Sequence, residues 1–471
     1  MFMNFISTLI VAFLTLGAAF AEQSRPSILF LAIDDLRPEL GCYGSPAVKS
    51  PNIDKLASQG VLFQRAYCQV AVCGASRASL MTGILPTKDR FVNYTTMADQ
   101  DTPGAVTLPQ ALKAAGYTTL SHGKVFHNWS DTAARSWSRP PKMGKDLKGR
   151  NANAQKKSRY GTQTRPGNSG SKPFFDRSDV PDDTYADGQV ARNTIADLRE
   201  LAQSGEPFFL ACGFIRPHLP FYAPEKYWDL YDADSLPIAK NRFRPHDAPT
   251  ALRGSGEYRT YDLGKFKKNS DDFHRIMRHG YFASTSYSDK LVGDVLSELE
   301  ALGLVDNTIV VIWGDHGWHL GEHAFWGKHN TLHNAIRVPL IVKAPGKLQG
   351  VTSKALVSTV DLFPTLCSLA GVDVPGSVQG KSFEQLLASQ DAQHTPAVYT
   401  RFKEADAVVT EGFSYSRFSD GSEMLFDLAK DPDENQNVAK VPEYASQLQV
   451  MCEELDQQIK LAQSAQWVPD R

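Results

Sequence analysis

The sequence predicts an α/β fold with a large, mixed, mostly parallel central sheet and a smaller C-terminal α+β subdomain that carries a short antiparallel sheet. Two observations predict it. From residue 24 to about residue 390, apolar runs of strand length alternate with amphipathic segments of helical length, which is typical of βαβ units. After residue 390, short strand-like runs precede a final helical segment, as in a small antiparallel sheet covered by a helix.

Each element is predicted by its own pattern, in chain order. Apolar runs that stop at Gly, Pro or polar residues predict buried strands over residues 27–33, 117–121, 207–214, 308–313 and 339–343. Apolar residues recur at helical spacing over residues 107–115, 184–203 and 281–302. In the C-terminal part, we expect strands over 397–401, 413–418 and 424–428 and a helix over 443–462.

Residues 135–177 interrupt this alternation. The segment is rich in Gly, Ser, Asn and Pro and contains twelve Lys and Arg against two Asp and Glu. Such a composition predicts a long surface insertion rather than core. Two interpretations stay open: a solvated insertion without a function, or a lid whose positive charge attracts an anionic substrate.

The apolar run over residues 5–20 is followed by small and then polar residues. This pattern predicts a signal peptide over residues 1–21, cleaved near Ala21, and export to the periplasm or out of the cell. The first four residues lack Lys and Arg, so an uncleaved anchor is the alternative. We therefore expect a signal peptide (1–21), a large α/β domain (22–390) and a C-terminal subdomain (391–471).

Composition excludes several classes of protein. Of 471 residues, 42% are apolar and 22% charged, which is ordinary for a globular chain. The net charge of −2 gives no global field that would favour nucleic acid or a stable membrane partner. Six cysteines are too few for a disulfide scaffold in an exported chain of this length. If Cys73 has a chemical role, two disulfides at most can form.

Acidic residues follow two of the predicted strands. Asp34 and Asp35 end the first strand, and Asp315 and His316 follow the strand at 308–313. The carboxyl ends of strands in an open α/β sheet share one rim, so these side chains are expected to meet. Three crowded carboxylates repel one another unless a cation separates them. Although a single Asp pair is typical of a turn or helix cap, two such clusters favour one Ca²⁺, with Mg²⁺ as the second choice.

A second cluster begins at Cys73. Small residues before a helix-forming stretch place Cys73 at a helix N-terminus, where free N–H groups favour anions and lower the pKa of a thiol. Arg77 lies one turn further along the same face. On these residues alone, a buried cysteine with a surface arginine is an equally good interpretation.

Further titratable residues follow other strands. Lys124 and His127 follow the strand at 117–121, His218 follows the strand at 207–214, and Lys328 closes a Gly-, His- and Trp-rich segment. Together with a metal and a nucleophile, they predict a site for an oxyanion ester. Trp318 and Trp326 either stack on a sugar or belong to the core. Structural roles are expected for His122, His319, His323, His329 and His333.

These motifs resemble the sulfatase family. Residues 73–83 are similar to the family signature Cys-x-Pro-x-Arg followed by a helix ending in Thr-Gly, in which the cysteine is oxidised to Cα-formylglycine. Position 75 is Ala where the signature has Pro. The run from Asp34 and the Asp-His pair at 315–316 are most similar to the iduronate-2-sulfatase branch. Similar motifs also surround 124–127, 216–218, 314–317, 328 and the stretch from Leu425.

The resemblance implies an alkaline-phosphatase-like fold and a role for each matched residue. Ca²⁺ would be bound by Asp34, Asp35, Asp315, His316 and the modified Cys73. Arg77 and Lys124 would hold the formylglycine hydrate, His127 would assist its turnover, and His218 and Lys328 would grip the sulfate. A formylglycine-generating maturation enzyme would be the protein partner.

The chemistry fits these roles. A geminal diol attacks sulfur with one oxygen and expels sulfate by collapsing on the other, which replaces one difficult step by two easier ones. The sequence thus predicts a sulfuric ester hydrolase acting on a sulfated, uronate-containing oligosaccharide or polysaccharide. The alternatives are a phosphate or phosphonate monoester hydrolase of the same fold, and a catalytically silent glycan-binding protein in which Cys73 is unmodified.

Overall fold

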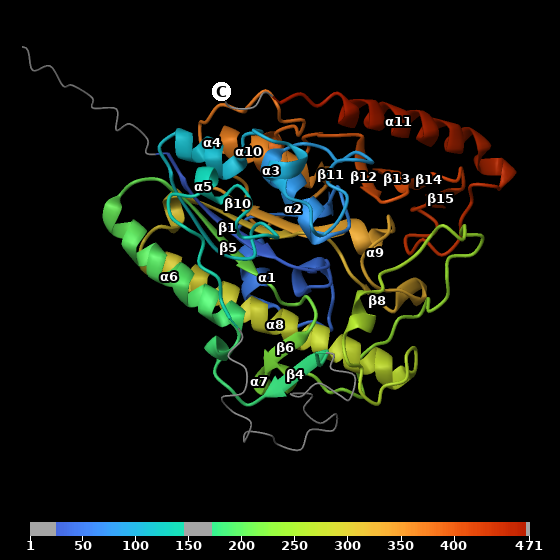
Figure 1. The fold of residues 1–471 in the computed structure, drawn as a ribbon, viewed down its shortest axis with the longest axis horizontal. Coiled ribbons are helices and arrows are strands. Elements are labelled where there is room, and N and C mark those ends of the chain that lie inside the picture. Colours follow the sequence, from blue (N-terminus) through green and yellow to red (C-terminus); the bar gives the residue numbers. More distant parts are fainter. Residues whose placement is uncertain (1–24, 146–171, 468–471) are drawn as a thin grey trace, which may run out of the picture.

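A mixed β-sheet forms the centre of the molecule (Figure 1). The computed structural model describes residues 25–145 and 172–467. Within them, the sheet has seven strands in the order β11-β2-β10-β7-β1-β5-β3, and β10 is antiparallel to both of its neighbours. The strands are β1 (Ser27–Ile33), β2 (Val61–Tyr67), β3 (Thr118–Gly123), β5 (Phe208–Phe214), β7 (Thr308–Gly314), β10 (Arg337–Lys343) and β11 (Val351–Ser358).

The central strand β1 contributes alternate side chains to two hydrophobic cores. One core lies between the sheet and helices α1 (Pro51–Ala57), α6 (Ala186–Ser204), α7 (Glu225–Trp228) and α8 (Asp271–Ala301). The other lies against α2 (Cys73–Thr82), α4 (Leu108–Ala114) and α10 (Leu362–Leu369), as Figure 1 shows. Both faces are therefore covered, and polar side chains collect at the ends of the strands.

The predicted mostly parallel sheet is confirmed, and all five predicted strands are present. Sequence analysis missed β2 and β11. In β11, exposed and half-buried residues alternate over the first half, as suits an edge strand and hides the apolar signal. Helix α8 starts ten residues earlier than predicted, at Asp271, where the Ser270 side chain accepts a hydrogen bond from Phe273 N (3.2 Å).

The C-terminal part forms a second sheet, also as predicted. Within the described residues, this sheet has four antiparallel strands, and helix α11 (Ala445–Gln463) covers it. The strands are β12 (Ala397–Phe402), β13 (Ala405–Thr410), β14 (Phe413–Phe418) and β15 (Glu423–Asp427). Short elements elsewhere are α3 (Ala98–Asp101), α5 (Ala133–Ser136), α9 (His333–Ile336), β4 (Phe175–Ser178), β6 (Phe221–Pro224), β8 (His319–Leu320) and β9 (Trp326–Gly327).

The flanks of the basic insertion belong to the fold. Arg139 forms an ion pair with Asp197 of α6 (2.7 Å), and β4 pairs with β6. The middle of the insertion and the signal peptide lie outside the described residues, so both stay predictions. No helix in the described part combines the length and the apolar character needed to cross a membrane. All six cysteines lie in the described part of the chain, and none of them forms a disulfide there.

Candidate active site

The acidic residues meet where the sequence places them, at the carboxyl ends of β1 and β7. These strands are parallel neighbours, and Ile33 pairs with Gly314, so the residues that follow lie side by side. The Asp35 backbone N–H donates a hydrogen bond to Asp315 Oδ1 (3.1 Å). Asp35 has a φ of 58°, in the left-handed region, which is uncommon for a residue with a Cβ and typical of functional sites.

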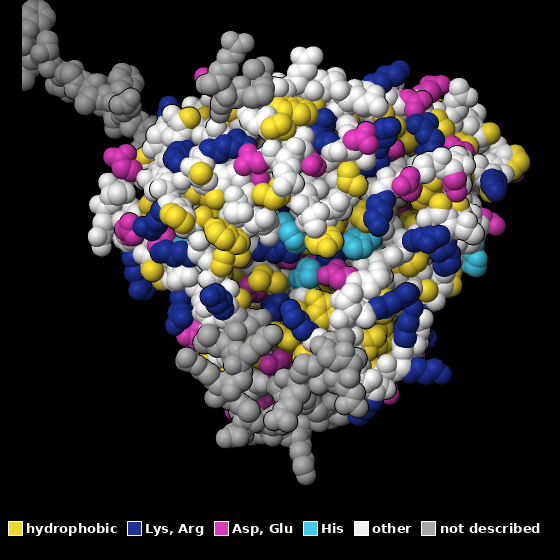
Figure 2. Space-filling view, viewed as in Figure 1, with side chains coloured by type: hydrophobic (Ala, Val, Ile, Leu, Met, Phe, Trp, Pro, Cys, Tyr) yellow, Lys and Arg dark blue, Asp and Glu magenta, His cyan; other side chains and the backbone are white. Residues whose placement is uncertain are grey.

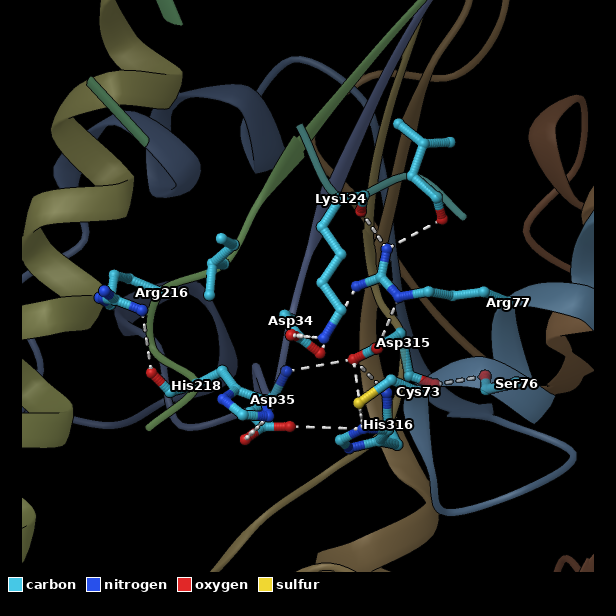
Figure 3. Close-up of polar contacts among 12 residues, drawn as sticks. Asp34, Asp35, Cys73, Ser76, Arg77, Lys124, Arg216, His218, Asp315 and His316 are labelled. Atoms are coloured by element: carbon cyan, nitrogen blue, oxygen red, sulfur yellow. Dashed lines mark hydrogen bonds and ion pairs between the residues drawn. The ribbon is translucent and has the colours of Figure 1, made fainter. Parts of the chain in front are cut away.

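Cys73 is the first residue of helix α2, as predicted, and its side chain points at the rim (Figure 3). Its Sγ lies 3.3 Å from His316 Nε2, and the residue is 2% exposed. The Ser76 hydroxyl donates to the Asp315 carbonyl (2.5 Å) and so ties the helix to the end of β7. The helix N-terminus thereby faces the carboxylates.

Two cations lie on one side of this cluster. Arg77 is fully buried, and its Nε donates to Asp315 Oδ2 (2.9 Å) while Nη2 lies 3.5 Å from Asp34 Oδ1. Its Nη1 donates to the Val125 carbonyl (3.0 Å). Lys124 Nζ donates to Asp34 Oδ2. Figure 3 shows both side chains converging on the aspartates from α2 and from the end of β3.

Two glycines allow the end of β3 to approach β5 closely enough to place Lys124. A Cβ on Gly213 would lie 2.2 Å from the Lys124 carbonyl carbon. Gly123 has a φ of +66°, and a Cβ there would lie 2.1 Å from the Gly213 oxygen. Side chains at either position would push the strands apart.

The remaining predicted cations lie on the opposite side. Lys328 Nζ lies 2.7 Å from Asp35 Oδ1 and 3.1 Å from Glu257 Oε2. His218 Nε2 lies 3.0 Å from Glu257 Oε1 and 3.9 Å from Asp35 Oδ2, and its Nδ1 contacts the Leu219 carbonyl. Sequence analysis missed Glu257, because it lies in a long connection without a predicted element or motif.

The structure describes contacts of His127 outside the cluster. Its ring contacts the Tyr94 ring at 6.0 Å, and its Nδ1 is buried without a hydrogen bond to the described residues. The two tryptophans that were candidates for sugar stacking are core residues. Trp318 and Trp326 are 0% and 1% exposed, and Trp318 packs beneath the Lys328 ammonium at 4.9 Å, so neither ring faces a substrate.

The other histidines of the predicted set lie outside the cluster. His122 bonds to Asp197 (2.7 Å) and His319 to Asn330 (3.2 Å), both in buried positions. The His323 ring lies 6.0 Å from the His319 ring, His333 begins α9, and His329 stacks on Phe402 at 5.0 Å. The structural roles expected for the first two agree with these contacts.

The pKa values of the three buried aspartates are shifted in different directions. Burial raises the pKa of Asp35 to about 6 and that of Asp315 to about 7. Burial acts on Asp34 in the same direction, but Lys124, His218 and Arg77 outweigh it and hold that pKa well below its usual range. Burial and Asp34 raise the pKa of Cys73, yet Lys124, Lys328 and His316 outweigh them and lower it.

This arrangement fits a divalent cation. One ligand atom from each of Asp34, Asp35, Cys73 and His316 lies within 4.8 Å of the others, and all four residues are buried. Asp34 Oδ1 and Asp35 Oδ2 accept no hydrogen bond from the described residues, which is costly for buried carboxylates. Oxygen-rich ligands suit Ca²⁺ or Mg²⁺. Asp315 already receives Arg77 and the Asp35 N–H, so its role as a ligand stays a prediction.

Two cavities adjoin the site. One of about 930 Å³ is lined by Val72 and Tyr94 among others, and one of about 560 Å³ by residues 250–254 and Gly256. Both also border His329 and the turn between β12 and β13, so the C-terminal sheet forms part of the wall. Figure 2 shows histidine side chains around a hollow in this face, with basic and acidic side chains inside it. With these volumes, the two cavities have room for a substrate larger than a sulfate ion.

The chain matches known proteins over most of its length. The family model described as Sulfatase matches residues 26–372, and the model described as N-sulphoglucosamine sulphohydrolase, C-terminal, matches residues 321–461. Iduronate 2-sulfatase of Mus musculus is 36% identical over 407 residues, which cover 77% of this chain and 72% of the relative. A sulfatase of Formosa agariphila is 30% identical over 444 residues, covering 91% and 86% of the two chains.

Solved structures share the fold. A phosphonate monoester hydrolase from Silicibacter pomeroyi has a TM-score of 0.74 at 23% identity and covers 92% of this chain and 95% of its own. A 2-O GAG sulfatase has a TM-score of 0.72 at 23% identity, with coverages of 94% and 93%. At these identities the likeness concerns the fold alone, and it confirms the predicted alkaline-phosphatase-like class.

Proposed function

The chain belongs to the sulfatase family, and on that premise we propose that it removes sulfate from a sulfated, uronate-containing carbohydrate by means of a formylglycine made from Cys73 and a bound Ca²⁺. It is a sulfuric ester hydrolase. One observation carries the proposed mechanism: Cys73 begins a helix in the middle of a buried cluster of metal-ligating groups and cations. A structural cysteine would not need such surroundings.

The carbohydrate part of the proposal is supported by the relatives. They include iduronate 2-sulfatases and an ulvan-active sulfatase of Formosa agariphila, which is 29% identical and covers 90% of this chain and 79% of the relative. The two cavities, which share His329 and the turn between β12 and β13 as lining, offer room for sugar residues next to the sulfated one. Which hydroxyl carries the sulfate is left to the experiment below.

Oxidation of Cys73 also suits the metal. A thiolate is a soft ligand that Ca²⁺ disfavours, whereas an oxygen-bearing side chain at position 73 would match the carboxylates. With both groups in place, the formylglycine hydrate would supply a nucleophilic oxygen and Ca²⁺ would polarise the sulfate ester. Asp34, Asp35 and His316 would hold the ion, together with position 73 and Asp315.

The cations of the chain stabilise charge around position 73. Arg77 and Lys124, anchored by Asp315 and Asp34, lie where they can orient an oxygen on residue 73. Lys328 and His218 lie on the opposite side, where they can bind sulfate oxygens. Losing one preorganised donor of this kind typically raises the barrier by about 3 kcal/mol. His127 would assist turnover of the hydrate from the neighbouring loop.

His218 is the proposed proton donor to the leaving sugar oxygen. Its Nδ1 faces the Leu219 carbonyl, which leaves Nε2 directed into the site. Burial lowers its pKa, but Asp35 and Glu257 outweigh that effect and raise it well above the usual value, so the ring is protonated. A protonated ring beside the bound ester can act as a general acid.

Mass spectrometry and a substrate screen test the proposal. Protein from the native host should carry an aldehyde or hydrate mass at Cys73, and it should desulfate defined sulfated, uronate-containing oligosaccharides. Turnover of aryl sulfate should exceed that of aryl phosphate. An unmodified thiol in an inactive protein would instead indicate a glycan-binding function.

Export and maturation complete the proposal. The apolar run at residues 5–20 supports export, and a formylglycine-generating enzyme would act on the signature that begins at Cys73. Position 75 is Ala where the signature has Pro, so it has to be tested which type of maturation enzyme oxidises Cys73. Coexpression with enzymes of different types, followed by mass analysis of the Cys73 peptide, answers it.

A further inference from the structure

Glu257 is a partly exposed acidic side chain of the site, and the proposed mechanism uses it only to raise the pKa of His218. It begins a 3-10 turn (Glu257–Thr260) in the connection between α7 and α8. The Glu257 N–H donates to Ser255 Oγ (3.1 Å), and the following residue, Tyr258, is buried against Phe273. The backbone is thus fixed on both sides, and the Glu257 side chain is 22% exposed.

The Glu257 carboxylate contacts both of the proposed sulfate-binding cations. Oε1 lies 3.0 Å from His218 Nε2, and Oε2 lies 3.1 Å from Lys328 Nζ. Each carboxylate oxygen therefore serves one cation, which is also how two oxygens of a sulfate group would bind between them. An incoming sulfate and the Glu257 carboxylate would therefore accept hydrogen bonds from the same two donors, His218 and Lys328.

Glu257 is negatively charged and therefore competes with sulfate for the two cations. Burial alone would raise the pKa of Glu257, but Lys328 and His218 outweigh burial and hold it well below its usual range, so the group is an anion. Asp35 also contacts Lys328 (2.7 Å), but Asp35 belongs to the candidate metal cluster. Glu257 does not belong to that cluster and remains the counter-ion of the two cations.

We propose that Glu257 is an internal counter-anion that sulfate must displace from His218 and Lys328, so that it sets the affinity of the site for the sulfate ester and for released sulfate. This role rests on the proposed function. Neutralising the cations in the free enzyme weakens binding of the substrate and of the product, because like charges repel at short range. Glu257 would thereby prevent the released sulfate ion from blocking the site.

Glu257→Gln tests the role, because it removes the charge and keeps the shape. The inhibition constant of inorganic sulfate against hydrolysis of 4-nitrophenyl sulfate should fall by about ten-fold, as expected for one partly buried like charge. Calorimetric titration of sulfate into the calcium-loaded protein should show the same tightening, independently of turnover. Unchanged or weaker sulfate binding would overturn the proposal, since a residue that only positions His218 and Lys328 would weaken binding when replaced.

Matched variants complete the experiment. Glu404→Gln removes an exposed carboxylate that borders both neighbouring cavities and should leave sulfate affinity unchanged. An equal effect of Glu404→Gln would attribute the change to the general field and overturn a specific role. Glu257→Ala should change affinity in the same direction as Glu257→Gln, with thermal unfolding as the check on folding.

The measurement separates this inference from the proposed function. Wild-type turnover of 4-nitrophenyl sulfate is measured first, and its absence from a protein with formylglycine at position 73 would contradict the function itself. Wild-type turnover combined with unchanged sulfate affinity in Glu257→Gln would contradict only the role of Glu257.

Discussion

Cys73 combines burial with surroundings that serve chemistry rather than packing. It is 2% exposed, and its sulfur faces His316 at 3.3 Å. We predict that Cys73→Ala lowers sulfatase activity by about 10⁴-fold or more, because the nucleophile is lost. Thermal unfolding should change little, since one small atom is removed. Retention of turnover in this variant would refute the role of position 73.

Arg77 neutralises two buried carboxylates at once, Asp34 and Asp315. Arg77→Ala leaves Asp315 without its arginine, while Asp34 keeps its contact with Lys124. Removing one partner of a buried ion pair typically costs about 3–5 kcal/mol. We expect that loss in the free energy of unfolding, measured by urea titration of the metal-free protein. Arg199→Ala, which breaks an exposed pair with Glu298, is the control and should leave the midpoint unchanged. Equal losses of stability in the two variants would contradict the role of Arg77 as the partner of buried carboxylates.

Single residues differ in how far the sequence reveals them. Asp34, Asp35, Asp315 and His316 could be placed because they end apolar strands, and strand ends share a rim. Glu257 could not, since only the fold of a long irregular connection brings it to His218 and Lys328. The orientation of Trp318 was equally hidden, because periodicity does not separate a core aromatic from one that faces a substrate.

At the scale of the elements, the acidic residues at the ends of β1 and β7 should make the affinity for the proposed calcium ion depend on pH. The pKa values of Asp35 and Asp315 are raised to about 6 and about 7, mainly by burial. The proposed calcium ion would bind the ionised form of Asp35 and, as a predicted ligand, of Asp315. Its affinity should therefore fall as the pH drops from 8 to 5, by up to about ten-fold per pH unit for each group that binds it. Calcium titrations by calorimetry at pH 7.5 and 5.5 should show this decrease, and equal affinities would contradict it.

In the absence of calcium, Asp35 and Asp315 should make the folded protein less stable as the pH rises. Their folded-state pKa values lie above the unfolded value of 3.8, so their stabilising contribution is complete below that pH and is lost as the pH rises through 6 and 7. We therefore expect chelation to destabilise the protein more at pH 7.5 than at pH 5.5. Thermal unfolding with and without a chelator at both pH values measures the difference.

The contact between β3 and β5 offers a test of how an element positions a side chain. A methyl group on Gly213 would overlap the Lys124 backbone at 2.2 Å, so Gly213→Ala should cost about 1–3 kcal/mol and displace Lys124. Activity should fall further than the loss of stability explains. Gly376→Ala, where an added Cβ meets nothing within 4 Å, is the control and should be close to neutral.

Element prediction succeeded where burial produces a clear pattern and failed where it does not. The fully buried strands β1, β5 and β7 are continuous apolar runs, which makes them readable. The first ten residues of α8 contain several charged and polar residues, yet Phe273, Ile276 and Met277 are buried there. Tertiary packing decides that helix, and local periodicity does not reveal it.

At the scale of the whole molecule, the C-terminal sheet is joined to the large sheet by a shared core. Leu85 and Val360 of the main part pack in one hydrophobic cluster with Tyr415 of β14 and Leu455 of α11. The Arg401 N–H donates to the Gln69 carbonyl (2.8 Å), which links β12 to the segment after β2. The wall of the active-site hollow therefore depends on α11.

This connection predicts one cooperative unfolding transition, to which α11 contributes. Leu455 is fully buried, so Leu455→Ala should cost about 2–5 kcal/mol and lower the midpoint of the whole transition. Val450 on the same helix is 55% exposed, and Val450→Ala should change stability by no more than about 0.5 kcal/mol. Calorimetry distinguishes the outcomes, because an early separate transition in Leu455→Ala would mean that the C-terminal part unfolds independently. We expect one transition at a lower midpoint, with sulfatase activity lost over the same temperature range. That result follows if the C-terminal sheet and the α/β part that carries the candidate site unfold together.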